Sequence, residues 1–376
     1  MQLTTATLLS ILLVSPMIRC AKAQDAAAPG AQAADTKSPG ATPADAKAQE
    51  SKAQDSKAQE SKPQDSKPQD SKSPAPQWPV KDGAAGEDIP GVVAKGTPIY
   101  KWSDGHQFTE GPACAPDGTM YFTDIPNNRV LRLDPAGAQV VLKDARGPFG
   151  LFFGKDGTLY CTQGADQRIA AFDPAKCKDG ACETRVICDK GPSGAPLGRV
   201  NDLVLDRTGG IWFTAPVIGR KKAGNAPDAV YYCPVEGGEA VQVVRDDKVV
   251  APNGVHLSPD SKTLYVLPYL SLELMAYPIE GPGKLGEGKV LYKIPGGTRE
   301  TIGGDGLTVD TRGNLYITVP ARAAVFVLSP DGKPLGMIRF PERPSNCALG
   351  GKDGRTLFVT AQTGVYSIDV EGARSR

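Results

Sequence analysis

From residue 101 to the end of the chain, short runs of alternating apolar and polar residues recur six times. Each repeat holds an entering strand, a turn such as Pro116-Asp-Gly118, an aromatic-rich strand and a third strand that ends near Asp-Pro. Aromatic and β-branched residues of this kind favour buried strands. The six aromatic-rich middle strands are expected at residues 120–123, 159–162, 211–214, 264–267, 315–318 and 357–360.

The spacing of the repeats predicts the architecture. Successive turns start between 39 residues (Pro116 to Lys155) and 53 residues (Asp206 to Pro259) apart. Units of that length with four strands are typical of propeller blades. The sixth repeat ends at 365–369 without a fourth strand, and an unassigned strand at 97–102 precedes the first repeat. We therefore expect an all-β, six-bladed β-propeller in which the N-terminal strand completes the last blade and leaves no bare edge.

The N-terminal 76 residues have a different composition. Residues 1–23 resemble a secretory signal, with an apolar core at 8–14 that is too short to span a bilayer. Cys20 gives the alternative of lipid attachment. Residues 24–76 repeat units such as Ser-Lys-Ala-Gln-Asp and lack apolar residues other than alanine. They predict a disordered tether, which could associate with the envelope, ahead of a propeller domain at 77–376. The protein is expected to be exported, to the periplasm or the medium.

Charge and cysteine content narrow the function. The formal net charge is +1 and the domain has no long basic run, which argues against nucleic acid as a partner. No later segment is apolar enough to cross a membrane. Cys177 and Cys182 flank Lys-Asp-Gly-Ala, so a hairpin disulfide is expected in an oxidising compartment. The run Arg220-Lys-Lys222 is interpreted as a solvated loop, with anion binding as the alternative.

One position in each repeat is expected to line the central channel, because the first strand of each propeller blade does so. Oxygen-bearing side chains predominate there, and a set of carboxylate and amide oxygens suits a hard divalent cation. Calcium is favoured because it accepts six to eight oxygen ligands in loose geometry, and magnesium is the second choice. A water-filled polar channel without metal is the alternative. Counting back from the turns, the six positions are Glu110, Phe149, Asn201, Asn253, Asp305 and Asn346.

Other residues near the channel have two interpretations each. Phe149 could form the floor of a substrate pocket or could plug the channel. His106, in a loop just before Glu110, could contact substrate at the rim or serve only in packing. Strand alternation places His256 on the face opposite to Asn253. It places Cys114 on the channel side, where we expect an apolar filler.

Four motifs resemble the gluconolactonase/regucalcin (senescence marker protein) family. They are Phe-Thr-Glu-Gly-Pro at 108–112, Arg-Val-Asn-Asp at 199–202, Ala-Pro-Asn-Gly-Val-His-Leu-Ser-Pro-Asp at 251–260 and Gly-Asp-Gly-Leu at 304–307. The resemblance covers roughly residues 97–371. It implies a six-bladed propeller with a divalent metal, often calcium, at the channel mouth. Many members hydrolyse sugar lactones, and the related diisopropyl-fluorophosphatase cleaves phosphorus–fluorine bonds.

The resemblance also implies roles for individual residues. Glu110 and Asn253 match family ligands of the metal, and Asp305 matches the last ligand, which is also the proposed catalytic base. Asn201 matches an amide that ligates the metal or holds substrate, and Arg199 matches a substrate-contacting arginine. The implied cofactor is one divalent cation, with calcium favoured and magnesium, manganese or zinc as alternatives.

The leading hypothesis is therefore an exported metal-dependent hydrolase that opens a sugar lactone or similar cyclic ester by metal-activated water attack. A phosphotriesterase-like hydrolase with the same metal site and a non-catalytic binding module are the alternatives. Two segments depart from the family pattern, Ala113-Cys114 and Pro268-Tyr-Leu270. Both are expected near the pocket, so they bear on which substrate is used.

Overall fold

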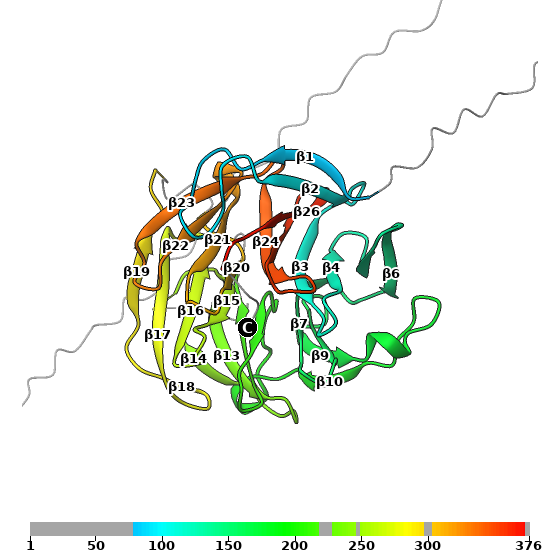
Figure 1. Cartoon of the computed structure of the whole chain (residues 1–376). Coiled ribbons are helices and arrows are strands. Elements are labelled where there is room, and N and C mark those ends of the chain that lie inside the picture. Colours follow the sequence, from blue (N-terminus) through cyan, green and yellow to red (C-terminus); the bar gives the residue numbers. More distant parts are fainter. Residues whose placement is uncertain (1–77, 218–227, 246–248, 297–302, 373–376) are drawn as a thin grey trace, which may run out of the picture. The chain divides into compact units, whose positions relative to one another are not determined.

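The computed structural model describes residues 78–217, 228–245, 249–296 and 303–372 (Figure 1). Within these ranges the helices are three-residue 3-10 turns, and no helix is long and apolar enough to span a membrane. The expected signal peptide at 1–23, the tether at 24–76 and the basic run at 220–222 lie outside the described residues. The 3-10 turns are η1 (Pro174–Lys176), η2 (Pro192–Gly194) and η3 (Pro320–Arg322).

The described strands form six antiparallel sheets, as the repeats predict, and each sheet is one propeller blade. The strand closest to the channel comes first in blades 1–5 and is followed by the predicted aromatic-rich strand. Blade 1 comprises β3 (Thr109–Cys114), β4 (Met120–Asp124), β5 (Arg129–Asp134) and β6 (Gly137–Lys143). Blade 2 comprises β7 (Pro148–Phe153), β8 (Leu159–Gln163), β9 (Arg168–Phe172) and β10 (Arg185–Cys188). Blade 3 comprises β11 (Leu203–Leu205), β12 (Gly210–Ala215), β13 (Ala229–Pro234) and β14 (Val241–Val244).

The last three blades continue the pattern, and the fourth carries an additional short strand pair. They comprise β15 (Pro252–Leu257), β16 (Thr263–Pro268), β17 (Glu273–Gly281), β18 (Lys284–Leu285) and β19 (Lys289–Lys293); β20 (Leu307–Val309), β21 (Leu315–Val319), β22 (Ala324–Leu328) and β23 (Pro334–Arg339); and β24 (Pro344–Gly350), β25 (Thr356–Ala361) and β26 (Gly364–Asp369), joined by β2 (Pro98–Ser103) and β1 (Val80–Ala84).

The ring closes through the N-terminal strand. β2 pairs antiparallel with β26, with Ile99 opposite Ile368, so the predicted closure is confirmed (Figure 1, blue beside red). β1 then adds a fifth strand to the same sheet, which the repeat pattern did not predict. The segment that follows β1 is also part of the core. Ile89 is only 1 % exposed and belongs to the same buried cluster as Ile338 and Phe340.

Threonine hydroxyls at the ends of the middle strands connect neighbouring blades around the channel. Each reaches a backbone carbonyl at the start of the next inner strand, and such bonds satisfy acceptors that would otherwise be buried without a partner. Blade 4 has Leu267 at the equivalent position and lacks this bond. The bonds run from Thr123 to Phe149 (3.0 Å), Thr162 to Asn201 (2.6 Å), Thr214 to Asn253 (2.6 Å) and Thr318 to Ser345 (2.8 Å), and the Ser345 hydroxyl reaches Thr109 (2.7 Å).

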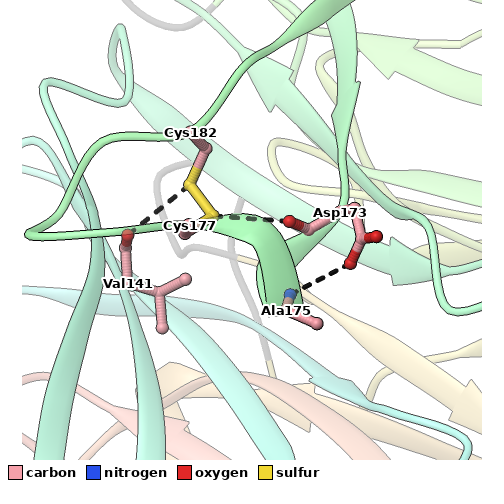
Figure 2. The surroundings of a disulfide bond; sticks show 5 residues. All are labelled: Val141, Asp173, Ala175, Cys177 and Cys182. Atoms are coloured by element: carbon pink, nitrogen blue, oxygen red, sulfur yellow. Dashed lines mark hydrogen bonds between the residues drawn. A yellow bond between two sulfur atoms is a disulfide. The ribbon is translucent and has the colours of Figure 1, made fainter.

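The predicted Cys177–Cys182 disulfide is present, with the two Cα atoms 4.4 Å apart (Figure 2). It closes the tip of the connection between β9 and β10. The tip lies against β6, because the Lys143 amide donates to the Gly180 carbonyl over 2.8 Å. Cys182 Sγ lies 3.5 Å from the Val141 carbonyl of the same strand. The disulfide therefore closes a hairpin of the second blade, and the tip of this hairpin contacts the first blade.

Candidate metal and active site

Strand pairing places five of the six predicted channel positions as expected. Glu110 pairs with Thr123 on β4, and Asn201 and Asn253 accept the threonine bonds through their carbonyls. Asn201 and Asp305 directly precede the inner-strand segments that begin at β11 and β20. All four predicted ligands are therefore at the same level of the channel.

The sixth position is wrong by one residue. Thr318 Oγ1 and the Gly306 amide both donate to the Ser345 carbonyl, at 2.8 and 2.9 Å, so Ser345 is the equivalent position and Asn346 is one residue deeper. The β24–β25 hairpin contains the additional pair Gly350–Thr356 before its turn. Counting back from the turn therefore stops one residue short, at Asn346 rather than Ser345.

Three of the four predicted ligands are brought together. Glu110, Asn253 and Asp305 are 6 %, 3 % and 8 % exposed, the charge of Glu110 acts on Asp305, and the Asn253 side chain hydrogen-bonds Asp305. Asn201 is at the same level and is 9 % exposed. The backbone carbonyl of Asn201 accepts hydrogen bonds from the Gly150 amide and the Thr162 hydroxyl.

Two further polar residues lie one step deeper, and sequence analysis missed their role. Asn346 Nδ2 donates to Glu110 Oε2 over 3.1 Å and also hydrogen-bonds Asp202. Asp202 accepts from the amides of Leu203 (2.9 Å) and Val255 (3.2 Å). Asn346 thus connects the acids of blades 1 and 3.

Glycines make room for this deeper pair. A Cβ on Gly306 would overlap the Asn346 side chain, and a Cβ on Gly150 would overlap Asp202 Oδ1. The equivalent position is glycine in four blades and polar only at Asp202 and Asn346, which are three blades apart. A polar residue at a position that is otherwise glycine is the signal that could have found them.

The three acids share a buried site. Burial raises the pKa of Glu110 to about 7, despite hydrogen bonds from the Gly111 amide and Asn346. Burial, with the charge of Glu110, raises the pKa of Asp202 to about 7. Burial, with the charges of the other two acids, raises the pKa of Asp305 well above its ordinary value. No cationic side chain in the described part of the chain contributes to any of these three shifts.

Within the described ranges, no group of three or more His, Cys, Asp and Glu side chains is arranged to hold a metal ion. A cation at this level would therefore depend on amide oxygens as well as on carboxylates. Asn253 and Asn201 supply such oxygens beside Glu110 and Asp305. This mixed set fits a hard divalent cation, because oxygen ligands from amides and carboxylates serve it equally.

Arg199 and Phe149 form a stacked pair at this end of the channel. The guanidinium carbon of Arg199 lies 4.5 Å from the centre of the half-buried Phe149 ring. Arg199 is exposed and makes no hydrogen bond or ion pair with the rest of the described protein. The other edge of the ring lies against Gly164, where a Cβ would fall 2.9 Å from Phe149 Cε2. Whether Phe149 forms the floor of a substrate pocket or plugs the channel stays a prediction.

Tyr269 is a second residue that the sequence did not single out. It is half-buried, and burial together with the charge of Asp305 raises its pKa. Its carbonyl accepts a 2.8 Å hydrogen bond from the Gly303 amide, which ties the loop after β16 to the segment that carries Asp305. The departure from the family pattern at Pro268-Tyr-Leu270 therefore lies next to the expected base.

His106 has structural partners. Its Nε2 lies 2.7 Å from Ser103 Oγ, its Nδ1 lies 3.5 Å from Asp124 Oδ2, and its ring packs edge-on against Phe122 at 5.1 Å. These contacts match the packing interpretation. Substrate contact by His106 remains a prediction that no contact in the structure supports.

A cavity of about 480 Å³ occupies the deeper part of the channel, with Asp202 and Asn346 in its wall. Cys114 lines it, as alternation predicts. His256 lines it as well, so the expectation that His256 faces away is wrong. The reason is a bulge between Pro252 and Gly254, which shifts the register and turns the later residues of β15 to the other face.

The fold and the acid-and-amide set at the channel mouth define a six-bladed propeller with a polar central site. Residues 108–363 match the family described as SMP-30/Gluconolactonase/LRE-like region, and the chain belongs to this family.

Three relatives indicate the range of activities in this family. A gluconolactonase of Zymomonas mobilis is 26 % identical over 303 residues, which cover 74 % of this chain and 82 % of that protein. Diisopropyl-fluorophosphatase of Loligo vulgaris is 32 % identical over 191 residues, which cover 46 % of this chain and 57 % of that protein. The structure of a gluconolactonase from Xanthomonas campestris superposes with a TM-score of 0.65 at 25 % identity, over 77 % of this chain and 98 % of that one.

Proposed function

We propose that this protein is a divalent-metal-dependent hydrolase that opens a sugar lactone or a similar cyclic ester. The observation that carries the proposal is the buried trio Glu110, Asp202 and Asp305, whose pKa values are raised and which no cationic side chain of the described residues neutralises. Like charges confined in this way are costly unless they are protonated or paired with a cation. Similarity to gluconolactonases supports the choice of lactones.

The residues proposed to hold the cation are Glu110, Asn201, Asn253 and Asp305. Their carboxylate and amide oxygens favour calcium, with magnesium next and manganese or zinc as further candidates. When bound there, a divalent cation polarises an ester carbonyl and stabilises the negative charge that develops during hydrolysis. Asn346 has a supporting role, because its amide holds Glu110 in place and leaves the other carboxylate oxygen free.

Asp305 is proposed as the general base that accepts a proton from the attacking water. Its hydrogen bond with Asn253 fixes the orientation of the carboxylate. Arg199, stacked on Phe149, presents unpaired N–H donors to the hydroxyl or carbonyl oxygens of a substrate.

A phosphotriesterase-like activity is the second candidate, and the similarity to diisopropyl-fluorophosphatase favours it. It would use the same cation and the same four oxygen donors. A non-catalytic binding module is less well supported, because such a module has no need for three buried acids that interact within its channel.

We also propose that the protein is exported to the periplasm or the medium. The support is the apolar core at residues 8–14 and the small-residue pattern Ala21-Lys-Ala23 ahead of Gln24. The disulfide between Cys177 and Cys182 agrees with an oxidising compartment. The N-terminal residue of protein recovered from an expressing cell tests this, and a mature chain that still begins at Met1 contradicts it.

The function is tested by combining metal analysis with an activity screen. Purified protein, stripped with a chelator and reloaded with calcium, magnesium, manganese or zinc, is assayed against sugar lactones and organophosphates with a pH indicator. We expect near-stoichiometric calcium and lactone hydrolysis that the chelator abolishes and calcium restores. Cleavage of organophosphates alone would favour the second candidate. Full activity in the stripped protein would refute the metal-dependent proposal.

A further inference from the structure

Two buried cysteines meet where the second and third blades pack together. Cys188 ends β10, the outer strand of blade 2, and Cys233 lies on β13 of blade 3. They are 1 % and 0 % exposed and belong to the same hydrophobic cluster, together with Leu197 and Tyr231. Both are free thiols in the structure.

Backbone hydrogen bonds hold the two cysteine segments against each other. The Gly238 amide donates to the Ile187 carbonyl over 3.3 Å, and the Ala240 amide donates to the Lys190 carbonyl over 2.8 Å. Cys233 Sγ lies 3.7 Å from the Gly238 carbonyl, and Cys188 Sγ lies 3.6 Å from the Lys190 carbonyl. The segment around Cys188 is thus bonded across the blade boundary to residues 238–240, whose Gly238 carbonyl lies beside Cys233 Sγ.

The two thiols also interact, which lowers the pKa of Cys188 and raises that of Cys233. Cys233 Sγ lies in addition 3.4 Å from the Pro234 carbonyl. Cys161 and Cys347 likewise direct Sγ at a backbone carbonyl, 3.4 Å away, but no second thiol acts on the pKa of either one. One thiol pair among the five free cysteines is therefore placed for cross-linking.

We propose that Cys188 and Cys233 form a second disulfide, which links blades 2 and 3 covalently. Both thiols lie in one buried cluster, and backbone hydrogen bonds hold residues 187–190 against residues 238–240, so side-chain rotation can bring the two sulfur atoms to bonding distance. The proposal is independent of the hydrolase activity.

The oxidant is a low-molecular-weight disulfide such as oxidised glutathione. The Cys188 thiolate attacks one glutathione sulfur, the glutathione S–S bond breaks, and one glutathione thiolate leaves. The Cys233 thiolate then attacks Cys188 Sγ and displaces the second glutathione. Two cysteines are oxidised, one glutathione disulfide is reduced to two thiols, and the two cysteine protons go to those thiols. Because both cysteines are buried, the exchange takes place while blades 2 and 3 assemble.

The bond would fix the start of the segment that leads to the candidate site. Residues 189–200 follow Cys188 directly and carry Arg199, and Asn201 comes next. The ring closed by the disulfide spans residues 188–233 and includes all of this segment. Closing a ring of this length restricts the unfolded chain and stabilises the folded one.

Peptide mapping of the full chain tests the disulfide directly. Protein folded with reduced and oxidised glutathione is alkylated in denaturant without reductant and digested with trypsin. Cleavage after Arg185 separates Cys182 from Cys188, so the two disulfides give different linked peptides. We expect one linked pair containing Cys177 and Cys182 and a second containing Cys188 and Cys233. Alkylation of both Cys188 and Cys233 before reduction would overturn the proposal.

Thermal melting provides a second measurement. The glutathione-treated protein should melt roughly 5 °C higher than protein treated with a reductant. Cys233→Ser should reduce this difference, whereas Cys347→Ser, at a buried cysteine whose described hydrophobic cluster contains no second cysteine, should leave it intact. If Cys233→Ser keeps the full difference and Cys177→Ser removes it, the stabilisation belongs to the first disulfide and the proposal fails.

Discussion

Asn346 donates a 3.1 Å hydrogen bond to Glu110, and the two residues are 236 positions apart in the sequence. One belongs to the last blade and the other to the first. Asn346 lies on β24 and Glu110 on β3, and these two inner strands contact each other where the last blade meets the first. The amide of Asn346 also bonds Asp202, so a single side chain orients two of the three buried acids. The boundary between the last and the first blade therefore forms part of the candidate site.

Asn346→Ala tests this link. Removing the amide frees the Glu110 carboxylate to rotate and leaves Asp202 with one hydrogen bond fewer. Loss of a group that orients a metal ligand typically weakens metal affinity by about 10- to 100-fold. We expect calcium affinity, measured by titration calorimetry, to fall by at least about tenfold.

Asn314→Ala is the matched control for that variant. Asn314 is also a buried amide, and its Nδ2 donates to Asp310 Oδ2 over 2.9 Å. It should cost stability without changing calcium affinity. Equal affinities for Asn346→Ala and the wild type would show that the Glu110 contact has no part in metal binding.

Asp305→Asn separates the proposed base from the proposed ligand. The amide keeps an oxygen for the cation but cannot accept a proton from water. We expect lactone turnover to fall by about 10²- to 10⁴-fold, with calcium binding weakened yet measurable. Asp353→Asn, at an exposed turn residue, should have no effect on either quantity. Unchanged turnover in Asp305→Asn would remove Asp305 from the catalytic role.

The sequence predicts most of the ring because the repeats carry local signals. The six middle strands, the closure by the strand at 97–102 and the Cys177–Cys182 disulfide depend on turns and strand periodicity, and the structure has all three. The middle strands and the disulfide are fixed within a few residues of chain, and the closure follows from counting the strands of the first and last repeats. The strands of a single blade can therefore be predicted from the sequence of that blade.

The wrong predictions concern positions that depend on strand irregularities or on contacts between blades. Counting from the turn places Asn346 at the wrong level of the channel, because its hairpin is longer. Strand alternation places His256 on the wrong face, because a bulge shifts the register of β15. Asp202 was passed over because its partners come from three other parts of the chain. Contacts between blades, such as those of Asn346 with Glu110 and Asp202, have no local pattern that a single sequence displays.

Burial of His106 predicts acid sensitivity. Burial lowers the pKa of His106 in the folded protein below its ordinary value of 6.5, although the charge of Asp124 partly opposes this and that of Arg129 adds to it. The unfolded chain therefore takes up the proton first as the pH falls. Stability from the neutral ring is complete above pH 6.5 and is lost as the pH falls below that value.

The measurement is the free energy of unfolding by urea between pH 7.5 and 5. Protonation of Glu110, Asp202 and Asp305, whose pKa values are raised, stabilises both proteins as the pH falls over this interval. The free energy of unfolding of the wild type should therefore change less favourably on acidification than that of His106→Gln. The comparison uses the slopes with pH, since the variant also loses ring packing against Phe122. Asp124 has a lowered pKa and contributes its own change only at more acidic pH. Parallel slopes for the two proteins would contradict the prediction.

The threonine bonds between blades give the last prediction. Thr214 Oγ1 donates to the Asn253 carbonyl over 2.6 Å, and both residues are buried. Thr214→Val keeps the shape of the side chain but removes the donor at this carbonyl. An unsatisfied buried acceptor costs about 1–3 kcal/mol, so we expect the free energy of unfolding to drop by about that amount.

Thr119→Val is the control, because the half-buried Thr119 hydroxyl makes no hydrogen bond in the described ranges. Since the lost bond positions the backbone of a proposed ligand, calcium affinity should also decline in Thr214→Val and not in Thr119→Val. A Thr214→Val protein as stable as the wild type would mean that neighbouring blades are held by packing alone.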